Sequence, residues 1–145
     1  MTPQYVEFDH GSNWYGRVLP FRNGILREPL GIEFTEHDLQ AERGQFHFAL
    51  VDGEVPVACL VAKPVGDCCF QLRQMAVAEQ HRGTGLGRQL IEQVEAALRE
   101  RGATELRLHA RTDAVGFYLK LGYTTIGQEF IEVTIPHQEM VKQLA

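Results

Sequence analysis

The sequence is poor in the residues that hold disulfide-rich domains and metal centres together. It contains three cysteines in 145 residues (Cys59, Cys68 and Cys69), and none belongs to a Cys-x-x-Cys pair. An odd number of cysteines does not suit a disulfide framework, so we expect all three to be reduced residues of the core or the sheet. The six histidines also lack the His-x-x-x-His spacing of zinc sites, and we therefore predict no structural metal.

Basic residues and long apolar runs are scarce as well. The chain has 14 Lys and Arg against 19 Asp and Glu, a formal net charge of −5, so it lacks the basic excess of general nucleic-acid-binding proteins. A small basic pocket for a phosphorylated ligand is still compatible with this charge. No apolar run is long enough to cross a bilayer, and we see no basic and apolar leader at the N-terminus. We expect a cytoplasmic protein with neither nucleic acid nor membrane as a partner.

Length and patterning predict one α/β domain over residues 1–145 with a mixed, mainly antiparallel sheet. Helix 12–26 should be short, bent or broken, because it contains Pro20 and Gly24. Thr35 and Asp38 should form a capping box for the next helix. We expect strands at 4–8, in a hairpin over 46–64, at 67–77, at 104–111 and twice within 123–137. We expect helices at 12–26, 35–42, 85–102 and 113–122, with a last helical turn at 138–144.

The stretch QHRGTGLG at 80–87 places three glycines at every second position, just before the amphipathic segment 85–102. It is not a Walker A loop, because Gly87 is followed by Arg88-Gln89 and not by Lys-Ser/Thr. It is not a dinucleotide fingerprint either, because the position of the third glycine is Arg88. A third hypothesis fits: glycines let a pyrophosphate approach the unpartnered first amides of the helix, with Arg82 and Arg88 beside it. The alternative is a glycine-rich turn that binds nothing.

The stretch MAVAEQHRGTGLGRQLIEQVEAAL at 75–98, followed by AVGFYLKLGY at 114–123, resembles the GNAT superfamily of acyl-CoA-dependent N-acetyltransferases. Gln80-x-x-Gly83-x-Gly85 matches the acetyl-CoA signature of that family. The resemblance is specific over residues 67–123, and LREPLG and FIEVTIPHQEM further resemble the branch of ElaA-type bacterial acetyltransferases. It implies an α/β fold whose central sheet is flanked by helices and has splayed fourth and fifth strands.

The resemblance also implies acetyl-CoA as co-substrate. In the family, exposed amides of the fourth strand pair with the pantetheine arm, and one of them polarises the thioester carbonyl. Many relatives have an Asn at the end of the fifth strand that contacts the cofactor or a bound water. This chain has Arg111 at that position, which puts the role of the Asn in doubt and offers a further positive group near the cofactor. The predicted cofactor-binding residues are Met75, Ala76, Val77, Gln80, Arg82, Gly83, Thr84, Gly85, Leu86, Gly87, Arg88 and Arg111.

Tyr118 is the general acid that the resemblance implies. A phenol with a pKa of about 10 stays protonated at neutral pH and can donate to a departing thiolate. Helical spacing alone favours a core residue, because Tyr118 shares an inward stripe with Ala114, Phe117 and Leu121.

The general base is left open among Glu28, Glu132, His109 and His137. We expect His109 to be a satisfied core group, and we predict Glu132 and His137 as catalytic residues. Residues 132–135 should be extended, and a turn at Pro136 should bring His137 beside Glu132.

The predicted acceptor-binding residues are Arg27, Glu28 and Arg73. Arg73 is unusual in the middle of a strand, because a charged residue there needs a partner or a pocket, and one of the acids named above could pair with it. The leading hypothesis is direct acetyl transfer from acetyl-CoA to a primary amine of a small molecule or a protein. The alternative is a non-catalytic acyl-CoA-binding or regulatory module on the same fold; the two failed motifs disfavour a mononucleotide-binding protein. The acceptor, the acyl-chain preference and the oligomeric state, a homodimer included, stay open.

Overall fold

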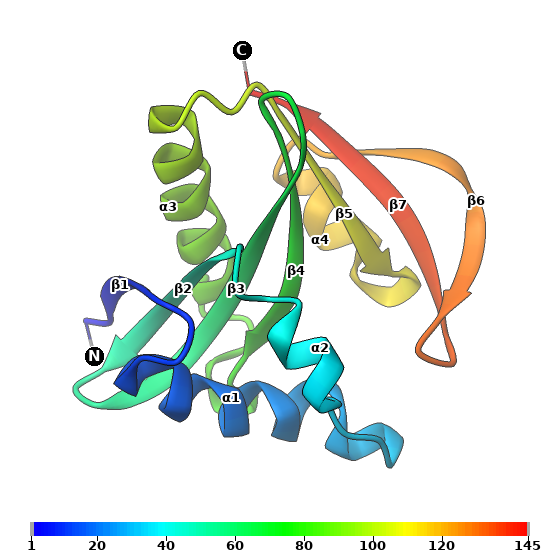
Figure 1. Ribbon diagram of the computed structural model, residues 1–145. Helices are drawn as coiled ribbons and strands as arrows, with labels where there is room; N and C mark the ends of the chain where they lie inside the picture. The colour runs from blue at the N-terminus through cyan, green and yellow to red at the C-terminus, as the bar shows by residue number, and fades with distance from the viewer. Residues whose placement is uncertain (1, 145) are drawn as a thin grey trace.

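Seven strands form one sheet in the computed structural model, which describes residues 2–144 (Figure 1). Their order across the sheet is β1-β2-β3-β4-β5-β7-β6. The strands are β1 Gln4–Phe8, β2 Phe46–Asp52, β3 Val55–Gly66, β4 Cys69–Val77, β5 Glu105–Arg111, β6 Thr124–Glu132 and β7 Ile135–Gln143. Only β4 and β5 are parallel, and the other neighbouring strands are antiparallel. The predicted mixed, mainly antiparallel sheet is confirmed.

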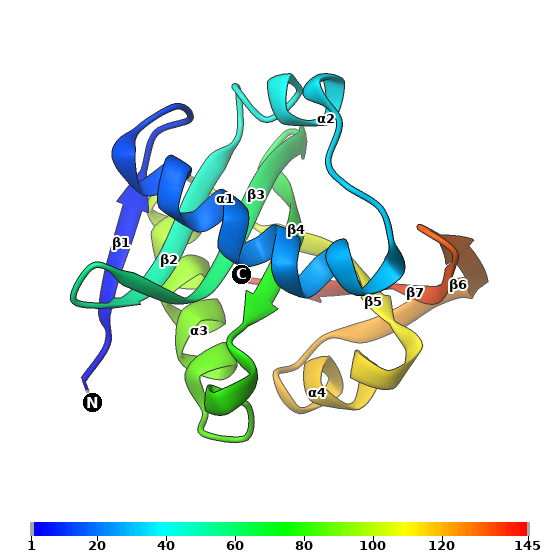
Figure 2. The same cartoon turned by 90° about the horizontal axis from the view of Figure 1, so that it is seen from below.

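Helices cover both faces of the sheet (Figures 1 and 2). The four α-helices are α1 Asn13–Leu26, α2 Glu36–Gln40, α3 Leu86–Glu100 and α4 Val115–Lys120. Three single 3-10 turns are η1 Glu28–Leu30, η2 Glu79–His81 and η3 Thr112–Ala114. α1 lies on one face, here called the α1 face, and α3 and α4 lie on the other. The capping box of Thr35 and Asp38 is confirmed, and no helix within residues 2–144 is long and apolar enough to span a membrane.

The two faces of the sheet bury separate apolar layers, because side chains alternate along each strand. The larger layer lies under α3, where Leu90, Val94 and Leu98 are completely buried against residues such as Leu60 of β3. The smaller layer lies under α1 and includes Cys59 of β3. Burial of the α3 stripe confirms the amphipathic helix expected over 85–102.

α1 is continuous, whereas the sequence predicted a short, bent or broken helix. Pro20 and the residue four positions earlier, Gly16, are both exposed, so water can reach the carbonyl that loses its hydrogen bond. Tyr15 and Val18 are buried against the sheet. Burying side chains of this size contributes about 1.5–3 kcal/mol each, which offsets a proline cost of about 3 kcal/mol. Gly24, also exposed, lies near the end of the helix.

The C-terminal segment is a strand, and the helical turn expected at 138–144 is wrong. β7 continues to Gln143, and it is inserted between β5 and β6. Met140 is completely buried there, opposite Leu108 of β5. Pairing on both edges satisfies the backbone of β7, and this long-range pairing overrides the local pattern of the segment.

β4 and β5 diverge part of the way along their length, as the resemblance implies. Their parallel pairing ends at Leu72 and Leu108. Directly beyond this point β4 has a bulge against β3, and Gln74 has a positive φ of 56°. A bulge bends its strand and increases the twist, so it directs the end of β4 away from β5. The β5-side edge of residues 73–77 therefore has no strand partner.

The cysteines occupy three different environments. Cys59 is buried, and burial raises the pKa of its thiol to about 12, so it stays protonated as expected of a core residue. Cys69 lies in β4, and its thiol donates to Glu105 at 3.3 Å. Cys68 is exposed in the β3–β4 turn with φ 58°, which corrects the expectation of an apolar, strand-like site. Within residues 2–144, no cluster of His, Cys, Asp and Glu is arranged to hold a metal ion.

Candidate active site

The glycine loop leads into the N-terminus of α3. Gly83 and Gly85 have φ values of 78° and 87°, a left-handed conformation that side chains disfavour. Gly85 is the N-cap of α3, and it has no side chain to accept a hydrogen bond from the first amides of the helix. The N–H groups of Leu86, Gly87 and Arg88 consequently have no partner within the helix, as the anion-site hypothesis requires.

Gly87 differs from Gly83 and Gly85, although the sequence grouped the three glycines together. It lies inside α3 with an ordinary helical backbone. A Cβ at this position would lie 3.2 Å from Cζ of Phe117, 3.4 Å from Cε of Met75 and 3.5 Å from a methyl group of Val77. Gly87 therefore allows the first turn of α3 to approach β4 and α4 closely. Gly83 and Gly85, by contrast, have open space around the Cβ position.

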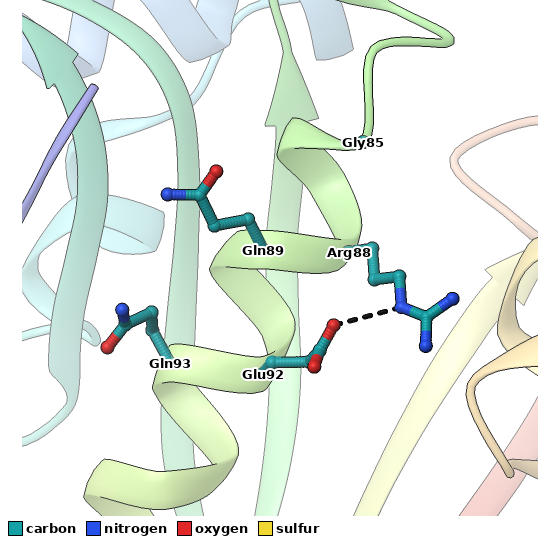
Figure 3. A pocket seen from close by; sticks show the side chains of 5 residues that line it. All are labelled: Gly85, Arg88, Gln89, Glu92 and Gln93. Atoms are coloured by element: carbon teal, nitrogen blue, oxygen red, sulfur yellow. Dashed lines mark hydrogen bonds and ion pairs between the residues drawn. The ribbon is translucent and has the colours of Figure 1, made fainter. Parts of the chain in front are cut away.

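The polar side chains of the loop are exposed, and two arginines already have partners. Nε of Arg82 donates to the Val77 carbonyl at 3.4 Å, and Nε of Arg88 donates to Glu92 at 2.9 Å. An open hollow of about 360 Å³ lies along α3 and is lined by Gly85, Arg88, Gln89, Glu92 and Gln93. Figure 3 shows these five residues and the pair of Arg88 and Glu92. Only Gly85 and Arg88 of the predicted cofactor residues line the hollow. Gln80 lies in η2, and the hydroxyl of Thr84 donates to the carbonyl of His81.

The end of β4 presents backbone groups at the open edge. Ala78 donates its N–H to Val57 of β3 at 2.9 Å. Because successive residues of a strand point their N–H groups to opposite edges, the N–H of Val77 points away from β3. Ala76 faces Cys59 across the β3–β4 ladder, and Met75 lies in the bulge together with Gln74.

Tyr118 lies inward, as both the spacing and the resemblance predict. It is 8% exposed and forms T-shaped contacts with the rings of Phe117 and Tyr123. Burial raises the pKa of its phenol to about 12. Within residues 2–144 its hydroxyl forms no hydrogen bond, whereas the hydroxyls of Tyr15 and Tyr123 donate to Glu42 and Glu95, as buried tyrosines usually do. The hydroxyl of Tyr118 is therefore free to donate to a ligand.

Glu132, His109 and His137 meet on the α1 face where β6 turns into β7; we call these three residues the carboxylate–histidine cluster. Oε1 of Glu132 lies 3.1 Å from Nδ1 of His109, and Oε2 lies 3.8 Å from Nε2 of His137. Nδ1 of His137 lies 2.8 Å from the carbonyl oxygen of Ile135, so it donates. A neutral His137 therefore presents the lone pair of Nε2 towards Glu132. The ring of Phe130 packs against both imidazoles.

The turn that builds this cluster is not the one we predicted. It consists of Val133 and Thr134, whose φ values of 43° and 67° are typical of a two-residue hairpin turn. Glu132 is paired with Ile135, and Pro136 lies inside β7. The prediction that residues 132–135 are extended is therefore wrong. Glu132 and His137 nevertheless lie close together, as we predicted. Two β-branched residues at positive φ are uncommon, which explains why the sequence did not signal the turn.

His109 is the residue whose environment the sequence analysis misjudged. Its side chain is 29% exposed on the α1 face and is not a core group. The signal was present in the alternation of β5, where Leu106 and Leu108 are buried and the odd-numbered positions are polar. Period-two alternation places His109 with Arg107 and Arg111 and apart from the apolar residues.

The predicted acceptor residues lie at the end of α1 and beside it on the sheet. The guanidinium of Arg27 lies 4.5 Å from the ring centroid of Phe34, and Nη2 of Arg111 donates to the Leu26 carbonyl at 3.3 Å. Arg73 pairs with Val61 in the β3–β4 ladder and forms no ion pair within residues 2–144, so the expected acidic partner is not found. Glu28 is exposed in η1.

Comparison with known proteins shows which family and which solved structures the chain is similar to. The family model of the acetyltransferase (GNAT) domain matches residues 31–144. The Bacillus subtilis protein YyaT is 34% identical over 132 residues, which is 88% of each chain. The crystal structure of Escherichia coli ElaA has a TM-score of 0.84 at 17% identity, over 97% of this chain and 99% of ElaA. An aminoglycoside 6'-N-acetyltransferase complexed with coenzyme A has a TM-score of 0.79 at 17% identity, over 98% of this chain and 97% of that enzyme.

Proposed function

The chain belongs to the acetyltransferase (GNAT) family, and on that premise we propose that it transfers an acetyl group from acetyl-CoA directly to a primary amine. The observation that carries this proposal is the divergence of β4 and β5 after Leu72 and Leu108. It leaves one edge of β4 unpaired and directs the N–H of Val77 towards it. An extended pantetheine arm could pair with that edge as an added strand, and an amide there could polarise the thioester carbonyl.

The glycine loop supports acetyl-CoA as the co-substrate. The free amides at the start of α3 and the positive end of the helix dipole favour an anion, and the pyrophosphate is the anion that we propose binds there. Gly83 and Gly85 have no atom within 4 Å of the position that a Cβ would occupy. The loop therefore leaves space for a phosphate to approach its backbone.

Two sets of side chains supply the proton transfers in this proposal. The amine nitrogen forms a bond to the acetyl carbon, the carbon–sulfur bond breaks, and the thiolate takes its proton from Tyr118. The raised pKa keeps the phenol of Tyr118 protonated at neutral pH, and its hydroxyl has no hydrogen-bond partner within residues 2–144 that competes for the proton. The proton of the amine passes to Glu132, directly or through a water, and Nε2 of His137, 3.8 Å from Oε2 of Glu132, can share that proton. Exchange with solvent water then returns a proton to Tyr118 and removes one from Glu132.

A screen of an amine library with thiol detection of released CoA tests this function. We expect CoA release that depends on both the amine and acetyl-CoA. Isothermal titration should show acetyl-CoA binding in the same preparation. Tight binding without turnover on any amine would replace the enzyme with a non-catalytic acyl-CoA-binding module.

A further inference from the structure

Three arginines at the acceptor side form a group without acidic partners; we call them the arginine cluster. Arg27 follows α1, Arg73 lies in β4 and Arg111 ends β5. None of them forms an ion pair with a side chain of residues 2–144. All three are partly buried, where an uncompensated charge is more costly than at an exposed position.

The three arginines come from distant parts of the chain and converge at the C-terminal end of α1. Nη2 of Arg111 lies 3.3 Å from the carbonyl oxygen of Leu26, the residue directly before Arg27. Burial lowers the pKa of the Arg27 guanidinium, and the positive charges of Arg111, Arg22 and Arg73 lower it further. Arg73 follows Leu72, which is buried under α3, so its side chain lies on the opposite face of the sheet, where α1 packs.

Neighbouring acids do not neutralise this cluster. Arg22 is paired with Glu42, in a buried ion pair that uses that carboxylate. Asp38 favours the charged form of Arg27, but it lies beyond ion-pair distance and accepts the N–H of Thr35 at 2.9 Å. Glu28 follows Arg27 directly, but it is exposed and forms no ion pair with an arginine of residues 2–144. The cluster therefore keeps an excess of positive charge.

The guanidinium of Arg27 is positioned to use its donors. Its Cζ lies 4.5 Å from the ring centroid of Phe34, and Arg22 lies at the same distance from the same ring. Nη1 of Arg27 donates to the Leu26 carbonyl at 3.4 Å. A guanidinium has five N–H donors, so this one contact leaves the other donors of Arg27 available for a planar or tetrahedral oxyanion.

We propose that the arginine cluster binds an anionic group of the acceptor, so that the substrates are primary amines that also carry a carboxylate or a phosphate. This inference rests on the proposed function and specifies its substrate class. It assigns Arg111 to the acceptor in place of the cofactor role that the resemblance suggested, because Arg111 contacts the end of α1. The carboxylate–histidine cluster is adjacent, because Arg111 is directly opposite His137 in the β5–β7 register. One acceptor molecule can thus place its anion on the arginines and its amine at Glu132.

Three amines of equal chain length test the proposal: one that ends in a carboxylate, one in a phosphate and one in an uncharged amide. We expect the wild-type protein to use the better anionic amine with a kcat/KM about 10- to 100-fold above that of the amide. Comparing kcat/KM for the carboxylate amine and the phosphate amine decides which anion the arginine cluster prefers. Arg27→Gln, Arg73→Gln and Arg111→Gln should each reduce this preference mainly by raising the acceptor KM, with the acetyl-CoA KM unchanged.

Arg17→Gln is the matched control, because it removes the same charge from α1 at a distance of about 15 Å from Arg27 along the helix. It should leave the preference intact. Equal use of the amide and both anionic amines would overturn the arginine assignment and leave the proposed function standing. An acetyl-CoA KM that rises in Arg111→Gln without a change in the acceptor KM would also overturn it. Acetylation of no amine at all would overturn both proposals.

Discussion

Nδ1 of His109 on β5 donates a hydrogen bond to Oε1 of Glu132 at the end of β6, over 3.1 Å, although β7 lies between these two strands. On the other side of the ring, Nε2 of His109 lies 4.0 Å from the carboxylate of Glu139 on β7. The contact holds the Glu132 carboxylate over the α1 face, beside His137. The side chain of Glu132 is 44% exposed, so a substrate can reach it. Unlike an ordinary surface glutamate, it is held in place by the hydrogen bond from His109.

Glu132→Gln is expected to lower turnover by about 10²- to 10⁴-fold, since it preserves the shape of the side chain and removes the proton acceptor. The acceptor KM should rise and acetyl-CoA binding should stay unchanged. His137→Ala should have the same effects to a smaller extent. The measurement is a pH–rate profile of kcat/KM. Its acidic limb reports the protonation of the general base, so this limb should differ between the wild type and Glu132→Gln.

Glu129→Gln, an exposed position on the same strand, is the control and should behave like the wild type. If Glu132→Gln retains the wild-type acidic limb and acceptor KM, then Glu132 is neither base nor ligand. Glu28 would then be the next residue to test.

Tyr118→Phe should reduce turnover by about 10²- to 10⁴-fold with little change in acetyl-CoA affinity, because only the hydroxyl is lost. The pKa of Tyr118 in the folded protein, about 12, lies above the ordinary tyrosine value of about 10 because the phenol is buried. A tyrosine whose pKa is higher in the folded than in the unfolded state stabilises the fold below its unfolded pKa, and this stability is lost as the pH rises through its folded pKa. The free energy of unfolding should therefore fall less steeply between about pH 10 and pH 12 in Tyr118→Phe than in the wild type, as measured by denaturant unfolding. Turnover within about threefold of wild type would make Tyr118 a core residue only.

Gly85→Leu should weaken acetyl-CoA binding, because it places a side chain over the amides at the start of α3. The substitution also strains the backbone, since Gly85 has a φ of 87°. Gly102→Leu is a matched control at the other end of α3, with the same φ of 87° and the same open space around the Cβ position. Both variants should lose similar stability in thermal unfolding. Equal acetyl-CoA affinities of the two variants would contradict the phosphate-loop assignment.

Lys142→Met should destabilise the fold by about 3 kcal/mol, because it leaves a buried carboxylate without its cation. Nζ of Lys142 donates to both oxygens of Glu95 at 3.1 Å, and Tyr123 donates to the same carboxylate at 2.8 Å. The side chain of Glu95 is 6% exposed. The double variant Glu95→Met/Lys142→Met should lose less stability than the single variant in urea unfolding. A loss below about 1 kcal/mol for Lys142→Met would show that water replaces the lysine.

Local signals predicted those elements whose own residues contain the necessary information. The apolar stripe of α3, the capping box of α2 and the hairpin at Asp52-Gly53 were all found at the expected places. Two of the wrong predictions, the form of α1 and the C-terminal helical turn, concern elements where a packing or pairing partner decides the outcome. α1 tolerates Pro20 because its inner face is packed on the sheet, and residues 138–143 are extended because strands lie on both sides of them.

The sequence by itself determined the order of helices and strands as far as β6, the glycine loop before α3 and the polar alternation of β5. Only the tertiary structure decided which charged side chains meet. Arg111 reaches the carbonyl of Leu26 across 85 positions of the chain, and His109 reaches Glu132 across 23 positions and over an intervening strand. Such contacts depend on the insertion of β7 between β5 and β6 and on the bulge at Gln74. Both arise from long-range strand pairing, which local sequence patterns do not encode.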